Sequence, residues 1–179
     1  MRKFKSAKEI KVGVIGYGGA FNMGRQHLLQ MQAAGMTPHA VCEIDRSRLE
    51  VAKQEFPGIA TFTKLDAMLR EAQPDLAVLI TPHNLHAKQA IQCLNAGASV
   101  VCEKPFAITT AECDAMIAAA KRRRLVLSTY HNRHWDGGIL AAMKALQSGR
   151  IGQVYKIEAN MGSWGKPGDW WRSSKSISG

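Results

Sequence analysis

Short apolar segments alternate with helix-length segments along most of this chain, and the alternation limits the folds open to it. Apolar runs predict strands at residues 10–15, 38–42, 60–62, 75–81, 98–102 and 125–129. Parallel strands need helix-sized crossover connections, whereas antiparallel strands can be joined by short turns. The sequence therefore predicts an α/β fold with a doubly wound parallel sheet, in strand order 3-2-1-4-5-6.

The connecting segments carry helix start and stop signals. Helices are expected at residues 23–34, from about 47 to 57, at 63–72, at 86–96 and from 109 onward. Ser47 with Glu50, and Thr109 with Glu112, have the spacing of a capping box. Beyond the last predicted strand, only one further helix, at 138–147, and one strand, at 153–159, are expected. A single strand leaves both of its edges unpaired.

Composition places the chain among ordinary soluble proteins, with 46% apolar and 21% charged residues. No apolar stretch approaches the roughly 20 residues of a membrane span, and no signal-peptide core follows the N-terminus, so a cytoplasmic location is expected. The four cysteines form no Cys-x-x-Cys pair and lie within apolar segments. They are expected to be reduced core thiols.

The formal net charge of +10 includes a dense basic run at residues 121–124. This run ends an alanine-rich helix, where cations are favoured by the negative end of the helix dipole. Nucleic acid is the alternative partner, but the chain contains no helix-turn-helix, zinc-finger or stacking-aromatic pattern. A positive field also suits a polyanionic cofactor or an acidic substrate.

A glycine-rich turn follows the first predicted strand and begins with Gly16, Gly18 and Gly19. Glycines at this place let the backbone approach a pyrophosphate at a helix N-terminus. The match to G-x-G-x-x-G is imperfect, because Phe21 stands at the third glycine's position and Gly24 comes three residues late. The turn is thus a candidate dinucleotide site.

Glu43 ends the second predicted strand, where a carboxylate would accept hydrogen bonds from an adenosine ribose. A carboxylate there would repel a 2′-phosphate, which favours NAD. Arg46 and Arg48 lie close by and could reverse that preference, so NADP stays open. The alternative is that Glu43 and Asp45 merely start a helix.

Glu103-Lys104-Pro105 closes the fifth predicted strand. Ligands of open α/β sheets bind just outside the strands' carboxyl ends, so Lys104 would bring an ammonium group to the place where chemistry occurs. The alternative is a solvated lysine before a turn, because most lysines lie on protein surfaces.

The chain resembles the Gfo/Idh/MocA oxidoreductases in several motifs that follow one another in the family's order. The matching segments lie at residues 12–18, 81–86, 96–97, 103–105, 130–136 and 168–172. This resemblance implies an NAD- or NADP-dependent dehydrogenase that moves a hydride between nicotinamide and a sugar, polyol or related hydroxyl substrate. It implies that Lys104 is catalytic and hydrogen-bonds the reacting oxygen, where a fixed cation stabilises developing negative charge.

The resemblance also implies the rest of the site. The residues expected to bind the cofactor are Gly16, Gly18, Gly19, Ala20, Glu43, Thr81, Pro82, His83, Glu103 and Lys104. Arg133 and His134 would reach the substrate or the nicotinamide ring, and His86 would make a structural contact at the start of its helix. No metal is expected, because His83, His131 and His134 fit no zinc spacing.

Members of this family have a second, larger α+β domain. By the resemblance, residues 1–130 form the dinucleotide-binding Rossmann domain, and residues 131–179 are the beginning of a truncated substrate and dimerisation domain. The family's proton-transferring histidine would lie beyond Gly179, so this chain alone is expected to turn over slowly or not at all. A homo-oligomer is expected of the full-length form, and neither nucleic acid nor a membrane is expected as a partner. The alternative is a non-catalytic dinucleotide-binding module or sensor subunit.

Overall fold

The computed structural model describes residues 4–19, 22–160, 162, 164–165 and 173–178. Six parallel strands form one sheet in the order β3-β2-β1-β4-β5-β6, which confirms the predicted order. The strands are β1 (Lys11–Ile15), β2 (Thr37–Cys42), β3 (Ala60–Phe62), β4 (Leu76–Leu79), β5 (Ser99–Cys102) and β6 (Leu127–Thr129). All neighbouring strands run parallel, so the predicted doubly wound α/β fold is confirmed.

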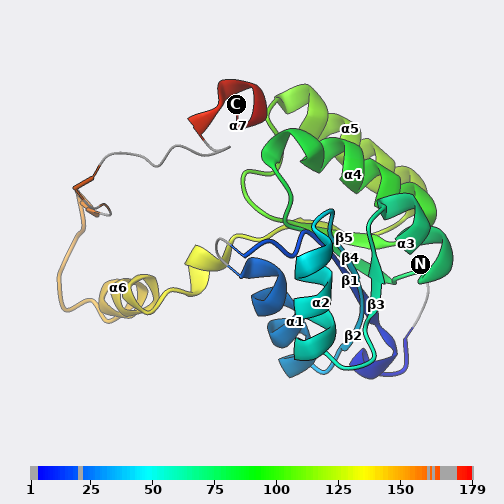
Figure 1. The fold of residues 1–179 in the computed structure, drawn as a ribbon. Helices are drawn as coiled ribbons and strands as arrows, with labels where there is room; N and C mark the ends of the chain where they lie inside the picture. Colours follow the sequence, from blue (N-terminus) through cyan, green and yellow to red (C-terminus); the bar gives the residue numbers. More distant parts are fainter. Residues whose placement is uncertain (1–3, 20–21, 161, 163, 166–172, 179) are drawn as a thin grey trace.

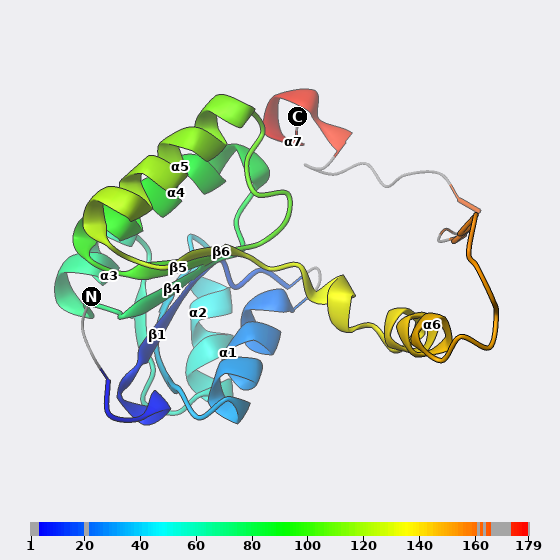
Figure 2. The ribbon, with the colours of Figure 1, turned by 180° about the vertical axis from the view of Figure 1, so that it is seen from behind.

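Helices cover both faces of the sheet, as Figures 1 and 2 show from opposite sides. One face carries α1 (Met23–Ala33) and α2 (Arg46–Glu55). The other face carries α3 (Leu65–Glu71), α4 (His83–Ala96) and α5 (Thr110–Arg123). The crossover from β3 to β4 changes faces, which places β1 beside β4 at the switch point of the sheet.

Side chains from the two faces of the strands form two buried clusters. Val12, Val14, Val41 and Val78 pack against α1 and α2, in a cluster that includes Leu28 and Leu49. Ile15, Leu79, Val100 and Cys102 lie in the other cluster, with Met68, Leu94 and Met116 from α3, α4 and α5. Burial on both faces explains why these strands are continuous apolar runs rather than alternating ones.

Three of the four cysteines belong to the core. Cys42, Cys93 and Cys102 are buried free thiols, and Cys113 is partly buried. Burial raises the pKa of Cys42 to about 11, and the pKa values of Cys93 and Cys102 to about 12. These thiols are therefore protonated at neutral pH, as expected of core residues.

Two predicted helix starts need correction. The Ser47–Glu50 capping box does not form, because Asp45 is the N-cap of α2 and accepts a hydrogen bond from the Ser47 amide at 2.8 Å. Helix α4 begins at His83 rather than His86, directly after Pro82, whose ring restricts φ and suits it to a helix start. The Thr109–Glu112 capping box of α5 is confirmed.

The basic run at residues 121–124 lies at the C-terminal end of α5, as predicted. Arg123 donates a hydrogen bond to the Asn95 carbonyl oxygen at 2.8 Å, near the end of α4. These cations therefore compensate helix C-termini, where carbonyl groups lack intrahelical partners.

The chain after β6 leaves the sheet and forms an arm (Figure 2). The arm contains a 3₁₀ turn (Asn132–Trp135) and α6 (Gly137–Gln147), which buries none of its residues. The strand predicted at 153–159 does not form; these residues have no regular secondary structure, and most are exposed. A strand needs a neighbour to bond its backbone groups, and none of the described residues supplies one.

A short helical turn, α7 (Lys175–Ser178), lies against α4. Among the described residues, no helix is both long enough and apolar enough to cross a bilayer.

Candidate functional site

The carboxyl ends of the strands lie level with one another, and this brings the predicted site residues together. Strand register pairs Ile15 with both Cys42 and Leu79, Leu79 with Cys102, and Cys102 with Thr129. Each of these is the last residue of its strand. The residues that follow the strands therefore share one edge of the sheet, as expected of a doubly wound fold.

The glycine turn after β1 packs closely against its surroundings at two points. Gly16 has φ +100°, and a Cβ there would lie 2.8 Å from the Ile80 carbonyl oxygen, so only glycine fits without strain. A Cβ on Gly24 would lie 2.7 Å from the Gly16 carbonyl oxygen and 2.7 Å from the Tyr17 ring. Gly24 thus lets α1 approach the turn closely, although it comes three residues late for the usual motif.

Gly18 differs, because no atom of the described residues, its chain neighbours apart, lies within 4 Å of the Cβ position. A side chain would fit there in the structure as it stands, so protein packing does not account for this glycine. Gly19 lies near the Arg48 guanidinium, with 3.4 Å between its Cβ position and Cζ. Ala20, also predicted to line the cofactor, lies outside the described residues.

Glu43 follows β2 and lies beside the glycine turn. Its Oε2 accepts a hydrogen bond from the Tyr17 amide at 2.7 Å, and its Oε1 accepts one from the Asp45 amide at 3.1 Å. The carboxylate is thus held in place at the position predicted to meet an adenosine ribose. Arg48 donates from Nε to the Tyr17 carbonyl oxygen at 3.0 Å, so its guanidinium lies over the turn.

Thr81 and Pro82 lie in the turn between β4 and α4, and His83 is the first residue of α4. The Thr81 hydroxyl donates a hydrogen bond to the Gln89 side chain. His83 is nearly buried, and its Nδ1 lies 3.1 Å from the Ser178 hydroxyl oxygen in α7. The C-terminal helical turn therefore contacts this part of the site, a contact that sequence reasoning did not predict.

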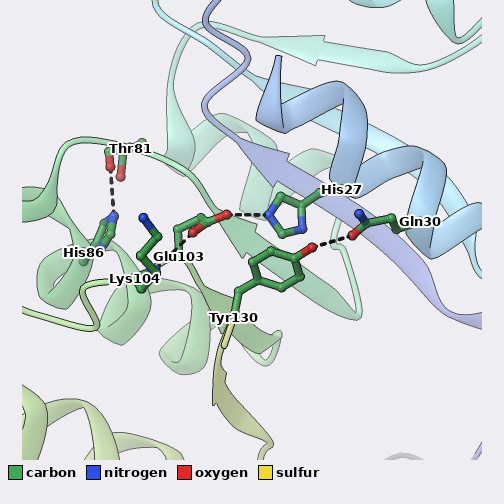
Figure 3. Close-up of polar contacts among 7 residues, drawn as sticks. All are labelled: His27, Gln30, Thr81, His86, Glu103, Lys104 and Tyr130. Atoms are coloured by element: carbon green, nitrogen blue, oxygen red, sulfur yellow. Dashed lines mark hydrogen bonds and ion pairs between the residues drawn. The ribbon is translucent and has the colours of Figure 1, made fainter. Parts of the chain in front are cut away.

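Glu103 and Lys104 follow β5 and face different surroundings (Figure 3). Glu103 is 9% exposed, and its Oε1 lies 3.0 Å from Nε2 of the fully buried His27. Its Oε2 accepts a hydrogen bond from the Lys104 amide at 3.1 Å. Lys104 is exposed, and among the residues that the structure describes none forms a hydrogen bond or ion pair with its ammonium group.

Charge interactions keep Glu103 ionised. Burial alone would raise the pKa of its carboxyl group, but the hydrogen bond and charge of His27 and the Lys104 amide outweigh burial and lower that pKa. The Glu103 carboxylate is therefore turned toward α1 and the protein interior. The Lys104 ammonium remains available to a ligand.

His27 was not among the predicted site residues. It lies within α1, 76 residues from Glu103, and its ring meets Tyr130 edge-on with 4.4 Å between ring centroids. Tyr130 follows β6, and its hydroxyl donates to Gln30 of α1 at 2.9 Å. The Nδ1 of His27 is buried without a hydrogen-bond partner among the described residues. This cluster ties α1 to the ends of β5 and β6.

The remaining predicted residues lie farther along the chain. Arg133 and His134 lie in the exposed 3₁₀ turn after β6, and Arg133 forms an ion pair with Asp136 at 2.8 Å. The motif at residues 168–172 lies outside the described residues. Within the described part of the chain, no group of three or more His, Cys, Asp or Glu side chains is arranged to hold a metal ion.

A parallel sheet with a glycine turn at its switch point and a carboxylate after the second strand defines a Rossmann-type protein. The chain belongs to the Gfo/Idh/MocA family, whose model, described as an oxidoreductase family with an NAD-binding Rossmann fold, matches residues 10–131. The predicted family membership is therefore confirmed.

Individual relatives agree with this assignment. An uncharacterized oxidoreductase of Schizosaccharomyces pombe is 38% identical over 66% of this chain and 33% of its own length. The scyllo-inositol 2-dehydrogenase (NADP⁺) of Bacillus subtilis is 31% identical over 84% of this chain and 42% of its own length. The crystal structure of an NAD-binding protein from Listeria innocua has a TM-score of 0.86 and 32% identity, covering 96% of this chain and 50% of that one. The chain thus spans a third to a half of these relatives.

Proposed function

We propose that this chain is the cofactor-binding part of an NAD(P)-dependent oxidoreductase acting on a hydroxyl group of a sugar, polyol or related compound. One observation carries the proposal. The level strand ends bring the glycine turn, Glu43, the Thr81–Pro82 turn and Lys104 to one edge of the sheet. Membership of an oxidoreductase family and similarity to an inositol dehydrogenase support the same reading.

The residues present fit a dinucleotide. The open space at Gly18 suits close approach of a pyrophosphate to the backbone, and α1 begins directly after the turn. Glu43 would accept hydrogen bonds from the adenosine ribose hydroxyls, which favours NAD. Arg48 lies nearby but is bonded to the Tyr17 carbonyl oxygen, so NADP would compete with an existing contact. When bound, nicotinamide supplies the hydride acceptor or donor.

Lys104 carries the chemical role in this proposal. Its ammonium would hydrogen-bond the substrate oxygen and stabilise the negative charge that develops there as the hydride moves. Glu103 holds the Lys104 backbone amide, so the main chain is fixed while the side chain is free to reach a ligand. Thr81, Pro82 and His83 would lie beside the nicotinamide half, and Arg133 with His134 would reach the substrate.

We also propose that residues 1–130 are one domain and that residues 131–179 begin a second one. Exposed apolar side chains along the arm support this division. Trp135 is 77% exposed and Tyr155 is 97% exposed, and Ile139, Leu140 and Met143 of α6 are about half exposed. Apolar surface of this extent is normally covered by further chain or by a partner subunit. A homo-oligomer is the arrangement we propose, and size-exclusion chromatography with light scattering tests it.

The first testable prediction concerns Gly18. Replacing it by alanine should leave folding intact, because the Cβ position is open, but should obstruct a pyrophosphate. We expect Gly18→Ala to weaken NADH binding at least tenfold in calorimetric titration, with an unchanged urea midpoint. Parallel titrations with NADH and NADPH measure the cofactor preference.

Gly137→Ala serves as the matched control, because its Cβ position is also open but lies on the arm. It should leave NADH affinity unchanged. If the unaltered chain bound neither NADH nor NADPH, the proposed function would be wrong. If the chain bound a dinucleotide but a longer form of the protein never transferred hydride, the alternative interpretation, a non-catalytic dinucleotide-binding module, would be correct.

A further inference from the structure

His86 is a fully buried histidine of α4 whose ring joins the two turns on either side of the candidate site. Its Nε2 lies 2.8 Å from the Thr81 carbonyl oxygen, a contact drawn in Figure 3. Its Nδ1 lies 2.9 Å from the Pro105 carbonyl oxygen. Thr81 belongs to the turn after β4, and Pro105 directly follows Lys104 in the turn after β5. One ring therefore spans the gap between these turns.

We propose that His86 is a positioning residue that sets where Lys104 lies relative to the Thr81–Pro82 turn. The inference rests on the proposed function, because it gives the two His86 contacts a role in cofactor and substrate binding. His86 does not touch the ligand itself in this proposal. It acts through the backbone of the residues that do.

The chemistry of the two contacts favours histidine at this position. Both partners are carbonyl oxygens, which only accept hydrogen bonds. The two ring nitrogens lie on different sides of a flat ring, so one side chain can meet both carbonyls. An amide side chain has its donors on a single nitrogen, so it could not place a nitrogen against each carbonyl in this way. His86 therefore bridges the Thr81 and Pro105 carbonyls.

Contacts on either side fix the Lys104 main chain. The Lys104 amide donates to Glu103, and the carbonyl oxygen of the next residue lies 2.9 Å from the His86 Nδ1. The side chain between these two anchors is exposed. A fixed backbone under a free ammonium group is what orientation of a catalytic group requires, since a displacement of about 1 Å can cost two orders of magnitude in rate.

A measurement on the unaltered protein tests directly whether His86 contacts the Thr81 and Pro105 carbonyls. Two-bond ¹H–¹⁵N correlation spectra should show a ring N–H hydrogen of His86 that exchanges slowly with solvent, because the ring is buried and lies against two carbonyl oxygens. A ring hydrogen that exchanged as fast as that of an exposed histidine would mean that neither carbonyl contact is formed, and that result would overturn the proposal. This test needs no cofactor, so it stands even if the proposed function fails.

The functional test replaces His86 by glutamine. Loss of one of the two contacts should weaken NADH binding roughly tenfold, the effect of about one hydrogen bond. The Lys104 backbone amide signal should also shift in ¹H–¹⁵N spectra, because its turn loses an anchor. If the unaltered chain binds NADH and His86→Gln binds it equally well, the positioning role is wrong while the proposed function stands.

His39→Gln is the matched control. His39 also bonds a backbone carbonyl, that of Ala72 at 2.9 Å, but it lies in the first half of β2, away from the strand ends. Its replacement should lower the urea midpoint without changing NADH affinity or the Lys104 amide signal. If both variants weakened NADH binding in proportion to lost stability, His86 would have a structural role only.

Discussion

Glu103 and Lys104 are adjacent residues with opposite surroundings. The Glu103 carboxylate is buried against His27, whereas the Lys104 side chain is exposed and its ammonium group forms no hydrogen bond or ion pair among the described residues. Strand geometry explains the difference, because successive side chains at the end of β5 point in opposite directions. The pair thus combines a buried structural carboxylate with an ammonium group that can meet a ligand.

Lys104→Met tests the chemical role of that ammonium group. In a form of the protein that transfers hydride, we expect kcat to fall by about 10²–10³-fold, the usual effect of removing one group that stabilises an oxyanion. The urea midpoint should stay unchanged, because the side chain is exposed. Lys88→Met, on the exposed face of α4, is the control. An unchanged kcat would show that Lys104 is a surface lysine without a catalytic role.

Glu103 makes stability depend on pH. Its pKa in the folded protein lies below the ordinary 4.5, so the contacts of the ionised carboxylate stabilise the fold fully above about pH 4.5 and lose this effect as pH falls through the folded-state value. Glu103→Gln should lower the free energy of unfolding at pH 7 by roughly 1–3 kcal/mol. The difference from the unaltered protein should shrink by pH 3.

Urea denaturation at the two pH values measures this effect. Glu50→Gln is the control, because Glu50 forms only an exposed ion pair with Lys53. It should change the free energy of unfolding by a few tenths of a kcal/mol at most. A Glu103→Gln difference that stayed constant between pH 7 and pH 3 would contradict the assigned pKa direction.

Helix starts are the elements most sensitive to single side chains. Thr109 caps α5 by accepting a hydrogen bond from the Glu112 amide at 3.2 Å, and Glu112 accepts one from the Thr109 amide at 3.0 Å. Thr109→Ala should cost about 1 kcal/mol of unfolding free energy. The neighbouring Thr110→Ala, with no capping contact among the described residues, should be nearly neutral. Equal urea midpoints for the two variants would rule out the cap.

Sequence patterns predicted the elements whose signals are local. The six strands before residue 130 formed because each is a short apolar run, and α5 began where its capping box lies. The α2 helix begins within one residue of its predicted start, but its capping residue was wrong, because Asp45 competes with Ser47 for the N-cap and short-range patterns do not decide between them. The strand at 153–159 failed because strand formation depends on a partner, which the pattern of one segment does not supply.

The site residues also fall into those that local sequence patterns predict and those that they do not. Glu43 and Lys104 were predictable, because each directly follows a recognisable strand. His27 was not, because its partners come from the ends of β5 and β6, about a hundred residues away along the chain. The double contact of His86 likewise depends on how two turns meet in space.

At the scale of the whole molecule, the sheet and its five covering helices hold the buried core, and none of the described residues of the arm belongs to it. Figure 1 shows α6 standing apart from the sheet. Stability should therefore reside in the first part of the chain, while the arm exposes apolar side chains that favour association.

Ending the chain after residue 136 tests this division. Because α6 buries none of its residues, we expect the shortened protein to unfold cooperatively at nearly the same urea concentration. The contact of α7 with His83 is lost, which should cost little because it is a polar contact near the surface. The shortened protein should also be more often monomeric in light scattering. A large loss of stability would show that the arm packs on the sheet.

The level ends of the strands have a consequence for how such a protein can change. Residues within the strands form the core, whereas Gly18 and Lys104, in the turns that follow β1 and β5, are exposed at the ligand edge. Substitutions at these exposed turn positions can therefore alter cofactor or substrate choice at little cost to folding, whereas Gly16 and Glu103 in the same turns are held by packing. Libraries randomised at Gly18 and Lys104 would retain cooperative unfolding far more often than libraries randomised at Ile15 and Cys102, which makes the exposed part of this edge a natural place to evolve new specificity.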